Sequence, residues 1–228
     1  MKLPVEFTGL EGRCLYQRKP VRFFNQSHKG WTHPYEYPPH PGGTLTSSGC
    51  GIFSACHAAE VMSGKRVSPE LLADFSCREG GRGDDGTNRP KLLAAMQEKG
   101  LAASYGFRYD GDGLLNDHEA LWKTMQEGGC ALCNLRVGHI VTLIAAREQN
   151  GERQLLAMDC HSESGDERVR DHVIEVVETS AVVSPITNQR GLVTGYQVNY
   201  GLFWVPLSLP RDFNLLHPLN KETEEATG

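Results

Sequence analysis

The feature that most constrains this chain is a cysteine between two glycines, Gly49-Cys50-Gly51, directly ahead of a run with helical spacing. The apolar members of that run recur near the helical period: Ile52, Phe53, Ala55, Ala59 and Met62. We therefore expect this helix to pack into the core. A thiol at a helix N-terminus lies beside unpaired N–H groups and the positive end of the helix dipole, which favour the thiolate. The pattern predicts a rigidly held nucleophile at Cys50.

A histidine and an aspartate further along the chain strengthen this prediction, because a buried cysteine taken alone is more often inert packing. His139 begins one strand-like segment, and Asp159 follows a second segment that ends at Met158. The polar turn at residues 148–152 predicts that the two segments form a β-hairpin. Antiparallel pairing then brings His139 and Asp159 to the same edge of the sheet. For His139 the alternative is an ordinary strand histidine with a structural hydrogen bond.

The Gly-Cys-Gly helix start, the Gly-His-Ile-Val strand and the Leu-Ala-Met-Asp strand end resemble the bacteriocin-processing leader peptidases. They are most similar to the stand-alone relatives of those enzymes among papain-like cysteine peptidases, over roughly residues 20–165. The resemblance implies that Cys50 is the nucleophile, His139 the base and Asp159 its orienting partner. It also implies an oxyanion-hole glutamine, for which Gln26 is the candidate. In the family the aspartate is usually followed by proline, a place that Cys160 takes here.

The order of elements predicts an α+β chain, and the resemblance implies a papain-like cysteine protease fold, with an N-terminal helical half and a C-terminal antiparallel β-sheet. We expect one domain over residues 1–208, with a helical lobe at about 47–128, a β lobe at about 129–208, and a partly disordered tail at 209–228. Helices are expected from Cys50 to near Gly64, after the N-cap Ser68, at 88–100 and at 116–127, the last capped by Asn116. Residues 80–87 are expected to be a flexible connection and 179–195 a long turn.

Composition limits the partners and the compartment. The formal net charge of -5 provides no basic footprint for nucleic acid, and no apolar stretch is long enough for a secretory signal or a bilayer span. Seven cysteines without a visible signal indicate reduced thiols, so we expect a cytoplasmic protein. The expected partner is a peptide or protein substrate, with no nucleic acid and no membrane. The oligomeric state is left open.

The main alternative to a cysteine nucleophile is the motif Cys130-x-x-Cys133, whose paired thiols could bind zinc or take part in redox reactions. Zinc needs four ligands, and only Cys160 and His161 remain to complete the set. Residues three apart on a strand face opposite sides, so we interpret these thiols as structural and predict no metal and no cofactor. His57 lies two helical turns from Cys50, about 10 Å away, too far to take its proton.

In the resembled family the substrate is a peptide cut after a double glycine, so the sequence predicts a cysteine peptidase. Two readings on the same scaffold stay open: an acyltransferase or transpeptidase, and a non-catalytic binding module. A third, a zinc-stabilised structural domain, would lose its fold with a chelator.

Overall fold

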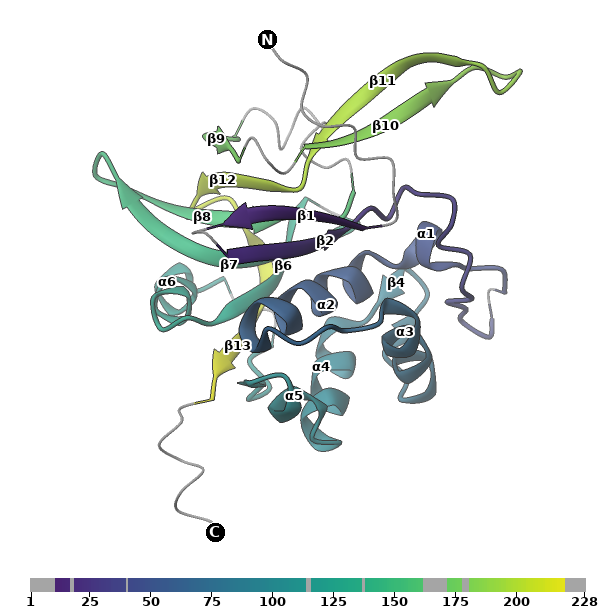
Figure 1. Ribbon diagram of the computed structural model, residues 1–228. Helices are drawn as coiled ribbons and strands as arrows, with labels where there is room; N and C mark the ends of the chain where they lie inside the picture. Colours follow the sequence, from purple (N-terminus) through teal and green to yellow (C-terminus); the bar gives the residue numbers. More distant parts are fainter. Residues whose placement is uncertain are drawn as a thin grey trace.

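The computed structural model describes residues 11–16, 19–39, 41–113, 116–136, 138–161, 172–177 and 181–219. Helices dominate the first half of the described chain and strands the second (Figure 1), so the predicted α+β class is confirmed. The helices are α1 (Leu45–Ser48), α2 (Cys50–Ser63), α3 (Pro69–Arg78), α4 (Arg89–Glu98), α5 (Leu101–Ser104) and α6 (His118–Gln126).

The strands form one large sheet and three small hairpins. The large sheet has the order β5 (Phe107–Arg108), β13 (Arg211–Pro218), β6 (Cys130–Arg136), β7 (His139–Gln149), β8 (Glu152–Met158), β12 (Leu202–Pro206), β9 (Glu175–Val176), and every described pairing in it is antiparallel. The hairpins are β1 (Glu11–Tyr16) with β2 (Lys19–Phe24), β3 (Arg82–Gly83) with β4 (Gly86–Thr87), and β10 (Ala181–Thr187) with β11 (Val193–Tyr200).

The large sheet is apolar on both faces, because alternate residues of each strand point to opposite sides. Helices α2 to α5 gather against one face, which carries Leu132, Ile140 and Leu156 (Figure 1). Helix α6 packs on the other face through Leu121 and Met125. Cys130 belongs to the first of these cores and Cys133 to the second, so the prediction that the two thiols face opposite sides is confirmed.

Most of the predicted helix ends are confirmed by their caps. Helix α2 ends at Gly64, which has the left-handed backbone (φ 69°) that glycine adopts without strain. The side chains of Ser68 and Asn88 accept backbone N–H bonds at the starts of α3 and α4. The predicted cap Asn116 is wrong, because Asp117 caps α6 and accepts from the N–H groups of the second and third helical residues. Asn and Asp cap equally well, so local preference could not choose between neighbours.

Three loop or tail predictions are also wrong in part. The tail predicted from residue 209 contains β13, whose Phe213, Leu215 and Leu216 are buried beside β6. The turn predicted at 179–195 contains β10 and the start of β11, and the connection at 80–87 contains the β3–β4 hairpin. Prolines and glycines in these stretches favour turns, but strand pairing overrides that local signal, with the distant β6 for β13 and within local hairpins for the other two. Residues 220–228 lie outside the described chain.

Among the described residues, none of the helices combines the length and the apolar character that a bilayer span requires.

Replacing Phe213 by alanine tests the assignment of β13 to the core. Phe213 is fully buried, so Phe213→Ala should lower the free energy of unfolding by about 3–5 kcal/mol, measured by urea denaturation. The matched control is Leu71→Ala on α3, where the side chain is 72% exposed and little change is expected. If Phe213→Ala left the midpoint of urea denaturation unchanged, Phe213 would not be part of the core and the prediction of a tail from residue 209 would stand.

Candidate active site

Cys50 is the first residue of α2, as the sequence predicts. The one-turn helix α1 precedes it, and Gly49 alone separates the two helices. A Cβ at position 49 would lie 2.4 Å from the carbonyl oxygen of Leu45, closer than two non-bonded atoms can approach. A glycine is therefore required at this break, which ends one helix and opens the next at the thiol.

Helix α2 is fixed to strand β7 by two reciprocal hydrogen bonds between buried residues. Ser54 Oγ donates to the carbonyl oxygen of Ile140 at 2.9 Å, and Thr142 Oγ1 donates to the carbonyl oxygen of Ser54 at 2.8 Å. Ser54 lies one turn after Cys50, and Ile140 follows His139 directly. We call this pair of bonds the Ser54–β7 seam. It sets the position of the thiol relative to the imidazole.

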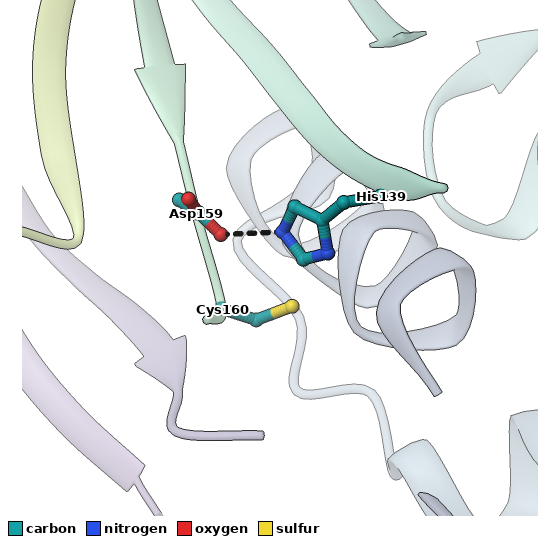
Figure 2. A group of neighbouring side chains, drawn as sticks. All are labelled: His139, Asp159 and Cys160. Carbon is teal, nitrogen blue, oxygen red and sulfur yellow. Dashed lines mark hydrogen bonds and ion pairs between the residues drawn. The ribbon is translucent and has the colours of Figure 1, made fainter. Parts of the chain in front are cut away.

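The structure brings Cys50, His139 and Asp159 together. His139 Nε2 lies 2.8 Å from Asp159 Oδ1, across the edge of the β7–β8 hairpin, as the predicted hairpin requires (Figure 2). The ring also makes a side-chain hydrogen bond with the Cys50 thiol. Because Nε2 is engaged by the carboxylate, the nitrogen that serves Cys50 is Nδ1.

The carboxylate of Asp159 is itself held in place. Its Oδ1 accepts a second bond, 2.8 Å long, from the backbone N–H of His161, and its backbone N–H donates to the Gly201 carbonyl. Both His139 and Asp159 are buried, at 6% and 1% exposure. A buried histidine with such a partner keeps one ring orientation.

Electrostatics in the site favour the ion pair of a thiolate and an imidazolium. Burial would raise the pKa of Cys50, but the hydrogen bond and charge of His139, with the N–H groups of Ile140 and Gly51, bring it below its ordinary value. Burial would likewise lower the pKa of His139, yet Asp159 and then Cys50 raise it to about 10. The pair is therefore charged between the lowered pKa of the thiol and the raised pKa of the ring.

Gln26 lies in the same neighbourhood and is buried. Its backbone N–H donates to the carbonyl oxygen of Cys160 at 2.7 Å, next to Asp159 in sequence. Its side-chain Nε2 donates to the carbonyl oxygen of Thr46 at 3.1 Å, just before α2 begins. The predicted glutamine segment thus joins the strand end that carries Asp159 to the turn that leads into Cys50.

The other described histidines and cysteines near this region have structural roles. His57 Nε2 accepts the backbone N–H of Phe24, and burial lowers the pKa of the ring to about 3, so His57 is a neutral acceptor in the core. Burial raises the pKa of Cys130 and of Cys133 to about 12, which keeps both thiols protonated. The prediction that these residues are structural agrees with their surroundings. His28 and His33 lie nearer the surface, and His40 lies outside the described residues.

Three side chains of the site have the spacing of a metal cluster. Ligand atoms of His139, Asp159 and Cys160 all lie within 4.8 Å of one another (Figure 2). However, His139 Nε2 and Asp159 Oδ1 are hydrogen-bonded to each other, and the Cys160 thiol contacts the side-chain oxygen of Gln26. All three side chains therefore have hydrogen-bond partners within the protein, and the absence of a metal stays a prediction. A second group of this spacing, Asp110, Asp112 and His217, lies beside β5 and β13.

Sequence reasoning missed the residues that hold the site together. Ser54 and Thr142 form the seam, and Cys160 and Thr46 contact the Gln26 amide. One signal was present, since Ser54 and Thr142 are polar residues within otherwise apolar stretches of a helix and a strand. Such residues are buried at little cost only where they find hydrogen-bond partners.

No protein-family profile and no curated protein matches this chain.

Alkylation of the thiols tests the lowered pKa of Cys50. Iodoacetamide should label Cys50 with a pH midpoint below 9.0, and faster at pH 7 than it labels Cys77, an exposed cysteine whose pKa burial raises. His139→Ala should move the Cys50 midpoint upward, because the burial remains while the bond and charge are lost. Rates for each cysteine can be followed by peptide mass spectrometry. Equal labelling of Cys50 and Cys77 at pH 7 would contradict the ion pair.

Gly51→Ala tests the close approach of the β3–β4 hairpin to the thiol end of α2. The added Cβ would lie 2.4 Å from Thr87 Cβ, which cannot rotate away. This overpacking, about 1–3 kcal/mol, should exceed the roughly 1 kcal/mol that alanine gains in a helix, so stability should fall in urea denaturation. Gly113→Ala is the control, because no atom lies within 4 Å of its added Cβ. A more stable Gly51→Ala variant would refute this packing.

Proposed function

We propose that this chain is a cysteine peptidase of papain-like fold that hydrolyses an amide bond of a peptide or protein substrate. The observation that carries the proposal is the line of hydrogen bonds from Cys50 through His139 to Asp159. Cys50 lies at a helix N-terminus, and His139 and Asp159 lie at the edge of an antiparallel hairpin. This arrangement supports the roles of nucleophile, base and orienting partner that the resemblance to the papain-like peptidases implies. Such a constellation is recognised by geometry and roles rather than by sequence position.

In the proposed reaction the Cys50 thiolate attacks the carbonyl carbon of the substrate. The His139 imidazolium gives its Nδ1 proton to the leaving amine, which departs and leaves a thioester on Cys50. Neutral His139 then takes a proton from water, whose oxygen attacks the thioester, and the acid product leaves as the thiolate and imidazolium re-form. Asp159 keeps the ring in one orientation throughout, through its bond to Nε2.

The negative charge that develops on the substrate oxygen needs hydrogen-bond donors. The N–H of Cys50 is in the first turn of α2, where helix geometry supplies no acceptor. Gln26 Nε2 carries two hydrogens and gives one to Thr46, which leaves the other for the substrate oxygen. These two donors form the proposed oxyanion hole.

The substrate class follows from the resemblance to enzymes that cut after a double glycine. Peptides with small residues ahead of the scissile bond are the first substrates to test. Acyl transfer to an amine shares every step up to the thioester, so the same assay with an added amine separates transfer from hydrolysis.

The experiment uses a library of quenched fluorescent peptides, including Gly-Gly sequences, and mass spectrometry after exposure to a peptide aldehyde. Turnover and an adduct confined to Cys50 are expected. Cys50→Ala should abolish turnover, and His139→Ala should lower it by about 10³-fold or more. Gln26→Ala should lower kcat by about 10²–10³-fold, because it removes one oxyanion donor.

Cys77→Ser is the matched control, since this exposed thiol is outside the site and its loss should leave turnover unchanged. A wild-type protein with neither turnover nor a Cys50 adduct would refute the peptidase and favour a binding module on the same scaffold.

A further inference from the structure

Cys160 makes two links with Gln26 that the proposed mechanism does not use. Its carbonyl oxygen accepts the Gln26 backbone N–H, and its thiol Sγ lies 3.3 Å from the side-chain oxygen Oε1 of Gln26. Cys160 is buried at 3% exposure, directly after Asp159, and Figure 2 shows its sulfur on the side of the strand that His139 occupies. The backbone of Cys160 thus binds the backbone of Gln26, and the Cys160 thiol binds the Gln26 side-chain amide.

The thiol has one proton to donate, and of the two acceptors described for it Gln26 Oε1 is the nearer. The carbonyl oxygen of Cys50 lies 4.0 Å from the same sulfur, at the limit of a sulfur hydrogen bond, whereas Gln26 Oε1 is 0.7 Å nearer. A thiol donates weakly, but a buried side-chain carbonyl without any donor would lose its hydration with no replacement. Of these two contacts, the one with Gln26 therefore takes the thiol proton.

This bond and the Thr46 contact together set which way the Gln26 amide faces. With Oε1 on the Cys160 thiol and Nε2 on the Thr46 carbonyl, each amide atom meets a complementary partner. A flipped amide would set its oxygen against the Thr46 oxygen, which is repulsive, and would exchange the S–H···O bond for a weak N–H···S contact. Without the thiol, only the Thr46 contact opposes rotation of the amide.

We propose that Cys160 is a positioning residue, which holds the Gln26 amide so that its second Nε2 hydrogen stays available to the substrate oxyanion. The inference rests on the proposed function for its catalytic consequence, although the orientation of Gln26 is a property of the folded protein alone. Cys160 acts through Gln26 and takes no part in the proton transfers of Cys50 and His139.

Kinetics of Cys160 variants test the catalytic consequence. Cys160→Ala should lower kcat about tenfold, a part of the loss expected when an oxyanion donor is removed, with KM unchanged. The alkylation rate of Cys50 should stay as in the wild type, because that rate depends on His139 and not on Gln26. Cys160→Ser keeps a donor and should restore most of kcat. Cys130→Ala controls for the loss of a buried thiol elsewhere and should leave kcat unchanged.

A double variant tests whether Cys160 acts through Gln26. In a Gln26→Ala background, Cys160→Ala should cause no further loss of kcat, since the group that it positions is gone. Two results would overturn the proposal: losses that multiply in the double variant, or an alkylation rate that falls together with kcat. The second result would mean that Cys160 supports Asp159 and His139 instead.

NMR of the Gln26 side-chain amide provides a readout that needs no activity. Comparison with Gln26→Ala assigns its two Nε2 hydrogens in ¹⁵N spectra of the full chain. Cys160→Ala should shift these signals toward those of an exposed glutamine, and Cys160→Ser should leave them near the wild type. Unmoved signals in Cys160→Ala would overturn the inference. Shifted signals in a wild-type chain that hydrolyses no peptide would instead refute the proposed function and leave the positioning of Gln26 intact.

Discussion

The Ser54–β7 seam is the interaction on which the rest of the site depends. A nucleophile and its base on different elements meet only if the two elements keep one distance and one rotation. Apolar packing between α2 and the sheet is strong but non-directional, so it tolerates small sliding movements. The two reciprocal hydrogen bonds at Ser54 add direction, because both partners are fully buried and neither finds water if the helix slides. The seam therefore turns hydrophobic contact into a fixed geometry.

The same fixed geometry accounts for a buried charge pair. An isolated charge in such a place would be costly, and the group would shift its pKa and become neutral. Here His139 meets a carboxylate on one nitrogen and a thiol on the other, and the thiol meets two backbone N–H groups. Each charge is matched by a neighbour that the fold already holds in position, so little reorganisation is needed when charge moves in a reaction.

The sequence allowed prediction of those parts of the site that belong to strong local patterns. Cys50 follows from a helix start, and the meeting of His139 and Asp159 follows from a single hairpin with a clear turn. The seam, the Cys160 contact and strand β13 were not predicted. Gln26 and Cys160 are 134 residues apart, and Leu216 of β13 pairs with Cys130 of β6, which lies 86 residues earlier. Contacts between residues so far apart in the chain leave no pattern in the local sequence. A polar residue in an apolar run indicates only that it has some hydrogen-bond partner, not which one.

Strand β13 also bears on how the chain is made. It covers the side of β6 that faces away from β7, and it is synthesised after every other described strand of the sheet. Until it is synthesised, β6 presents a row of unpaired backbone N–H and C=O groups, the kind of open edge on which other chains can assemble. The hairpin with His139 and Asp159 is complete well before that moment. A nascent chain thus contains the β7–β8 hairpin while the edge of β6 is still unpaired. A chaperone that covers strand edges would protect the chain from aggregation until β13 is synthesised.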